Sequence, residues 1–253
     1  MEMFFVKLLM FVAIFLFGFT GGMLPQVLGK TKHGGTILPL GSAFAGGVFL
    51  GAGTIHLLGD SHEYFARSMG EHEYPYFLMV CGSGFLLILL LEKVLVRADE
   101  AHAARSANPY MLMAVLSVHS FIAGTALGLE KELVAAVILL AAILAHKSFA
   151  AFALGISFVE AGLVKAKYYS LLAFFSIMTP LGVLLGALLN NFLHTRTALE
   201  LEAIFDGLAG GTFIYVASMD IINHTFSEPE TRWSKYIAIT LGYGLMAVLA
   251  IWA

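Results

Sequence analysis

Eight long apolar stretches run through this chain of 253 residues. Each is close to the roughly 20 residues that cross the hydrocarbon core of a bilayer as an α-helix. Charged residues make up only 12% of the chain, well below the share typical of a soluble domain. The sequence therefore predicts an all-α membrane protein with eight transmembrane helices, formed by a single domain over residues 1–253. The stretches are 3–24, 37–58, 75–91, 109–129, 133–159, 168–193, 203–222 and 236–253.

The lysines and arginines between these stretches predict the orientation of the chain, because cytoplasmic loops retain an excess of both residues. With the N-terminus outside, nine of them lie in inside loops and three in outside segments. We therefore expect both termini to be outside. The inside residues are Lys30, Lys32, Lys93, Arg97, Arg105, Lys165, Lys167, Arg232 and Lys235, and the outside residues are Arg67, Lys131 and Arg196.

A motif of small residues occurs twice. The segment 45–50 (AGGVFL) recurs as 209–214 (AGGTFI), and under the same alignment His56 matches Asp220 and Asp60 matches His224. Gly-Gly pairs are common wherever membrane helices pack closely, but the matching polar pairs favour a repeat. The two copies cross the bilayer in opposite directions, as in the inverted repeats of many transporters, whose substrate site lies near the membrane centre.

Two histidines lie deep in the fourth and fifth stretches, which form a hairpin. His119 precedes the centre of the connecting turn by about 12 residues and His146 follows it by about 15, so both lie near the bilayer centre. A polar side chain at that depth is usually functional, and imidazole binds zinc, iron, copper and nickel. The alternatives are a histidine hydrogen-bonded to a neighbouring helix, or a pair of axial haem ligands.

Further polar residues extend this candidate metal site into a path. Ser120 and Lys147 adjoin the two histidines, and the lysine is interpreted as a fixed positive charge replacing a second cation or as a proton-coupled group. Carboxylate and imidazole pairs mark both ends of the path, where they are plausible transient ligands for a metal. The path residues are His56, Asp60 and Asp206 at the outer end, and Asp220 and His224 at the inner end.

Four segments resemble the ZIP (Zrt-, Irt-like) family of metal-ion transporters. Residues 119–129 (HSFIAGTALGL) are similar to the family pattern His-Ser-x-x-Glu-Gly-x-Ala-x-Gly-Leu, and residues 146–155 (HKSFAAFALG) to His-Lys-x-x-x-Ala-x-x-Leu. Residues 178–182 and 209–215 match the sixth and seventh helices. The resemblance implies a 3+2+3 inverted-repeat bundle with both termini outside, which carries divalent metals toward the cytoplasm.

The resemblance also assigns roles to residues. It places His119 and His146 on the main metal-site positions and Asp220 on the inner path, whereas Lys147 and Thr179 occupy positions that carry further ligands in two-metal members. One metal per site is therefore implied. The family glutamate four residues after the first histidine is Ala123 here, which leaves open a fast low-affinity transporter, another ion preference, an inactivated form or a non-transporting relative.

The sequence therefore predicts a transporter, not an enzyme, which exposes its metal site alternately to the two sides without ATP, since no phosphate-binding loop motif is present. Zinc is the expected substrate, with iron and manganese as alternatives, and no organic cofactor is expected. The rival functions are a haem-binding electron carrier and a non-transporting metal sensor. We expect location in the plasma membrane and contact with lipid, with a homodimer as an option. A net charge of −3 argues against nucleic acid as a partner.

Overall fold

The computed structural model describes residues 2–70, 73–95, 109–130, 132–189, 195–227 and 231–251. Helices account for nearly all of these residues, and no strand occurs among them. The all-helical fold class is therefore confirmed. The segments are α1 (Glu2–Leu28), α2 (Gly34–Gly51), η1 (Ala52–Leu57), α3 (Leu58–Met69), α4 (Tyr76–Leu89), η2 (Leu90–Leu95), α5 (Pro109–Leu129), α6 (Leu133–Glu160), α7 (Lys165–Leu189), α8 (Thr195–Tyr215), η3 (Val216–Ile222), α9 (Asn223–Ser227) and α10 (Arg232–Leu249).

Seven of the eight predicted membrane crossings fall on helices that are long and apolar enough to span a bilayer. The eighth stretch is also helical, as α10, but it is not among the seven because Arg232 and Lys235 in its first turn lower its hydropathy. The eighth crossing and the orientation of the termini therefore stay predictions. Of the charges that predicted orientation, Arg97, Arg105 and Lys131 lie outside the described residues.

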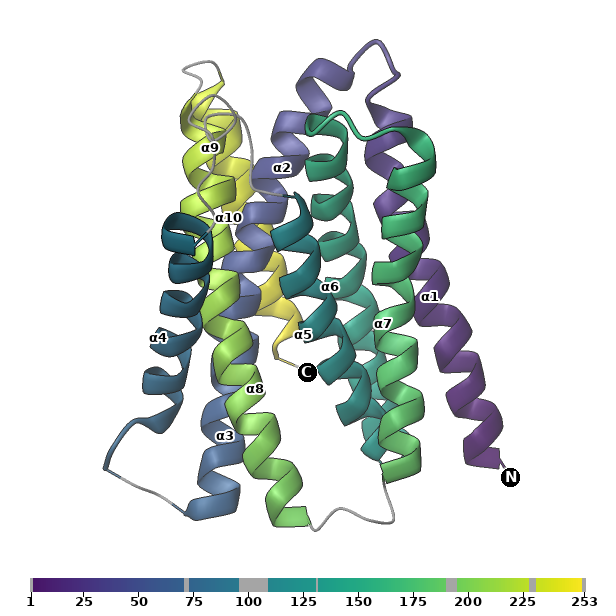
Figure 1. The fold of residues 1–253 in the computed structure, drawn as a ribbon, viewed down its shortest axis with the longest axis vertical. Helices are drawn as coiled ribbons and strands as arrows, with labels where there is room; N and C mark the ends of the chain where they lie inside the picture. The colour runs from purple at the N-terminus through teal and green to yellow at the C-terminus, as the bar shows by residue number, and fades with distance from the viewer. Residues whose placement is uncertain are drawn as a thin grey trace.

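The second crossing is longer than its apolar stretch. The sequence indicated an end near residue 58, but the helix continues through α3 to Met69, where Ser61 and Phe65 are buried. Ser61 donates a hydrogen bond to the Ala203 carbonyl of α8 at 2.6 Å. Packing against α8 therefore carries the helix beyond the hydrophobic stretch. Figure 1 shows α3, the start of α8 and the N-terminus at one end of the bundle and α9 at the other.

The helices pack as two groups. The most extensive pairs are α5 with α7 and α1 with α6 in one group, and α2 with α10 and α4 with α8 in the other. Narrower contacts of α2 with α6 and of α5 with α8 join the groups. The boundary between the two groups therefore runs through the middle of the bundle, and each group contains helices from both halves of the chain (Figure 1).

Glycines bring the paired helices to backbone contact. A Cβ on Gly211 of α8 would lie 1.9 Å from the Cys81 carbonyl oxygen of α4, and one on Gly47 of α2 would lie 2.0 Å from the Ile239 carbonyl oxygen of α10. These two glycines hold the same place in the repeated motif. Close helix approach over small residues replaces the hydrophobic effect as a source of association in lipid.

Two π-helical segments follow the repeated motif. η1 begins seven residues after Ala45, and η3 begins seven residues after Ala209. π-helical turns inside α-helices are frequent at functional sites, and here they contain His56 and Asp220 respectively. The irregular turns therefore coincide with two predicted path residues.

We expect Gly211→Ala to lower the melting temperature of the purified protein by about 5 °C, because an added methyl group in a tight contact costs about 1–3 kcal/mol. The matched control is Gly82→Ala on α4, where an added Cβ would meet nothing within 4 Å. Thermal unfolding in detergent measures both variants. Equal melting temperatures for the two would contradict the close α4–α8 contact.

Candidate functional site

Three buried imidazoles meet where the two helix groups adjoin. His56 comes from η1, His119 from α5 and His146 from α6, and their exposed fractions are only 9%, 6% and 8%. The ring centroid of His146 lies 5.6 Å from that of His56 and 5.8 Å from that of His119. His146 is therefore the ring that neighbours both others. The sequence analysis paired His119 with His146 but placed His56 at the outer end of the path.

The three imidazole rings have different contacts. His56 Nδ1 lies 3.1 Å from Asp60 Oδ2, one turn further along the helix, and the His146 ring is hydrogen-bonded to the Ala142 backbone carbonyl. His119 packs edge-to-face on Phe213 of α8 at 4.8 Å, and its buried Nδ1 has no hydrogen-bond partner. Metal-binding histidines usually use one ring nitrogen for such an outer contact and the other for the ion. The contacts of His56 and His146 follow that pattern.

The spacing of the rings is close to that of metal ligands. Two imidazoles that share one tetrahedral zinc, at Zn–N distances of about 2.0–2.1 Å, have ring centroids about 5 Å apart. The observed separations are slightly larger. Within the described ranges, no three His, Cys, Asp or Glu side chains are already grouped so as to hold a metal ion. The three rings would therefore have to move slightly before all of them could share one ion.

Lys147 fills a polar niche beside the histidines. Its side chain is 2% exposed, and Nζ donates to Ser120 Oγ at 3.2 Å and to the Phe175 carbonyl oxygen at 3.4 Å. Nζ also lies 4.0 Å from the centre of the Phe175 ring, a cation–π arrangement. Ser120, predicted as a metal ligand, is thus placed 6% exposed and in contact with Lys147. Gly18 of α1 leaves room for this lysine, because a Cβ there would lie 2.9 Å from its Cε.

Alanines stand one helical turn beyond His119 and His146. Ala123 follows the first and Ala150, which is 7% exposed, follows the second. Residues four apart on a helix are neighbours on its surface. Methyl groups therefore occupy the positions beside His119 and His146 where a carboxylate could stand, and among the three histidines only His56 has a carboxylate, Asp60, one turn further along its helix.

Carboxylates line the approach from the α3 end. Asp60 is partly exposed, with 28% of its side chain accessible, and it contacts His56 directly. Asp206 of α8 lies close enough to interact electrostatically with Asp60, with His56 and with Glu202. The structure therefore brings the predicted residues His56, Asp60 and Asp206 together. Glu202 was missed, although its place one turn before Asp206 could have indicated it.

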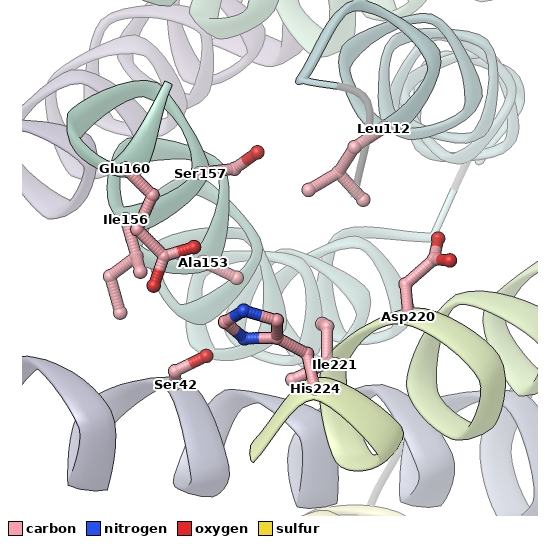
Figure 2. Close-up of a pocket in the computed structure, with 9 residues that line it drawn as sticks. All are labelled: Ser42, Leu112, Ala153, Ile156, Ser157, Glu160, Asp220, Ile221 and His224. Carbon is pink, nitrogen blue, oxygen red and sulfur yellow. The ribbon is translucent and has the colours of Figure 1, made fainter. Parts of the chain in front are cut away.

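At the opposite end, Asp220 and His224 line one small pocket (Figure 2). Glu160, the last residue of α6, also lines it. The sequence analysis predicted the first two residues and missed Glu160, which could have been found as an acidic residue closing an apolar helix that carries His146. The polar groups of the path thus lie at both ends of the three histidines.

Known zinc transporters are similar to this chain over most of its length. The family model described as ZIP zinc transporter matches residues 4–108 and 97–250. Zinc transporter ZIP2 of Mus musculus is 25% identical over 90% of each chain, and Zinc transporter ZIP1 of Danio rerio is 27% identical over 88% of each. Zinc transporter 1 of Oryza sativa subsp. japonica is 30% identical over 98% of this chain and 83% of its own length. The chain therefore belongs to the ZIP zinc transporter family and is an integral, multi-pass membrane protein.

Proposed function

We propose that the chain carries divalent metal ions across the membrane, zinc in particular, through a central site at His56, His119 and His146. The observation that carries this proposal is the meeting of three buried imidazoles from both helix groups. Burying an imidazole in an apolar bundle costs free energy, so such residues usually have a function. Imidazole nitrogens are good ligands for zinc. The relatives named as zinc transporters support zinc as the substrate, with iron and manganese as the next candidates. Those names do not favour haem binding or metal sensing.

The central site holds one ion at a time. His146 neighbours both other rings, so an ion bound to His146 has one further imidazole within reach on each side, and water or Ser120 completes the coordination shell. Lys147 occupies the adjacent niche, and in its charged form it repels a second cation. Without a carboxylate at Ala123 or Ala150, binding is weak and release is fast.

The polar residues at the two ends form the path. Asp60 and Asp206 attract the ion from the α3 end by their negative charge. Asp60 contacts His56 directly, so the ion can move from the carboxylate to the imidazole. Asp220 and His224 receive it at the α9 end. The positive-inside rule puts the α9 end in the cytoplasm, so we infer uptake into the cell. The plasma membrane is the proposed location.

Relative movement of the two helix groups opens the site to each side in turn. His119 and His146 belong to one group and His56 to the other, so movement at the boundary makes or breaks the site. Inverted repeats support such alternating exposure. The repeat is supported here by the equivalent glycine contacts at Gly47 and Gly211 and by the equivalent starts of η1 and η3.

We expect His119→Ala combined with His146→Ala to reduce radioactive zinc uptake by the chain at least about tenfold, since loss of even an outer-shell partner of a metal ligand weakens metal sites by about 10–100-fold. His56→Ala alone is expected to reduce uptake by a similar factor, because its ring adjoins His146. Uptake into proteoliposomes containing equal amounts of protein is the measurement.

The control for these variants is His33→Ala, which alters an exposed histidine in the turn between α1 and α2. Its uptake is expected to equal that of the unmodified chain. Unchanged uptake in the His119→Ala and His146→Ala double variant would exclude the central site. Unchanged uptake in His56→Ala alone would remove this histidine from it.

Restoring the missing carboxylate tests why it is absent. We expect Ala123→Glu to lower KM for zinc and to lower the maximal rate, because a charged ligand one turn from His119 strengthens binding and slows release. Ala123→Gln, which adds similar volume without charge, is the control. Uptake measured over a range of zinc concentrations separates the two effects. Uptake that appears only after Ala123→Glu would mean that the unmodified chain does not transport.

A further inference from the structure

A small pocket lies beyond the central histidines, at the α9 end. It has a volume of about 20 Å³ and is lined by polar groups from four segments, α2, α6, η3 and α9. This volume holds one water molecule or one ion, because a cavity needs roughly 10–15 Å³ for a single occupant. The polar lining residues are Ser42, Ser157, Glu160, Asp220 and His224.

The pocket is aligned with the central site. Leu112 precedes His119 by seven residues, and Ala153 follows His146 by seven, and both line the pocket. Asp220 likewise lies seven residues beyond Phe213, the ring that packs on His119. Seven residues are about two helical turns, or about 10 Å. The pocket therefore begins about two turns from the histidine level on each of these three helical segments. It lies along the proposed path.

The chemistry of the pocket differs from that of the central site. Figure 2 shows the Glu160 carboxylate and the His224 ring facing one another, with Asp220 on the opposite wall. Glu160 and His224 are also close enough to interact electrostatically. A carboxylate and an imidazole form a suitable ligand pair for a borderline divalent metal. Because only two side chains face each other here, water fills the remaining coordination positions and binding is weak.

The position of Glu160 favours a bound cation. It is the last residue of α6, and the C-terminal end of a helix carries a partial negative charge that disfavours a carboxylate. His224 is the nearest basic partner on α9. A divalent ion between the two side chains compensates both the carboxylate and the negative end of the helix.

We propose that Glu160 and His224 form a second, weaker divalent-cation site, which holds the departing ion after it leaves the histidines and passes Asp220. This site rests on the proposed transport function and extends it with a release station. It makes Glu160 a ligand of the transported ion. The weak, partly hydrated coordination favours dissociation into the adjoining aqueous side.

Binding measured without transport tests this site. In the His119→Ala and His146→Ala background, purified protein in detergent is titrated with radioactive zinc. We expect residual weak binding, and we expect Glu160→Gln or His224→Gln to lower its affinity about tenfold. Glu160→Asp, which keeps the charge, retains most of it. Glu132→Gln at the exposed start of the same helix and His33→Gln are the matched controls.

The outcomes separate the two proposals. Absence of residual binding, or residual binding that Glu160→Gln and His224→Gln leave unchanged, overturns the second site. In the chain with intact central histidines, Glu160→Gln is expected to lower the maximal uptake rate about fivefold with little change in KM, because release is slowed while central binding is intact. If uptake proves independent of the central histidines, the transport mechanism fails, while the zinc titration still decides whether the pocket binds the ion.

Discussion

The burial of three imidazoles and one lysine inside an apolar bundle is the constraint on which the rest of the structure depends. Each group must find a partner, since unsatisfied polar groups in such surroundings cost several kcal/mol. Asp60 contacts His56, the Ala142 carbonyl contacts His146, and Ser120 with the Phe175 carbonyl contacts Lys147. The Nδ1 atom of His119 is left without a partner. In the proposed mechanism, the transported ion provides that missing partner.

Helix contacts are close within each group and less extensive between the two groups. Glycines allow close approach of α4 to α8 and of α2 to α10. Gly124 does the same for α5 and α7, since an added Cβ there would lie 2.1 Å from the Thr179 carbonyl oxygen. The joins between the groups, α2 with α6 and α5 with α8, are narrower. These joins also carry the ring contacts of His56 with His146 and of His119 with Phe213. The three histidines thus lie at the narrow contacts between the two helix groups.

The helices and the family could be predicted from the sequence because apolar length and the two histidine motifs are local signals. The depth of His56 in the membrane could not be predicted in this way. Hydropathy indicated an end of its helix near residue 58, which puts His56 at the mouth, whereas packing of Ser61 and Phe65 extends the helix to Met69. His56 then lies 13 residues from that end, as His146 lies 13 residues from the start of α6. Glu160 and Glu202 were missed because only tertiary packing shows what a carboxylate at a helix end faces.

The distribution of charge along the proposed path offers an explanation of how a site with alanines one turn after His119 and His146 could conduct an ion. Asp60, Asp206 and Glu202 lie before the histidines, and Asp220 with Glu160 lies after them, while Lys147 is the charged residue beside the centre. Strong negative charge at the centre would deepen the binding well and slow escape, as conduction requires binding that is favourable enough to enter and weak enough to leave. Imidazoles replace water around the ion without adding charge. In the proposed mechanism, the ends therefore collect and release the ion, and the centre selects it by its preference for nitrogen ligands.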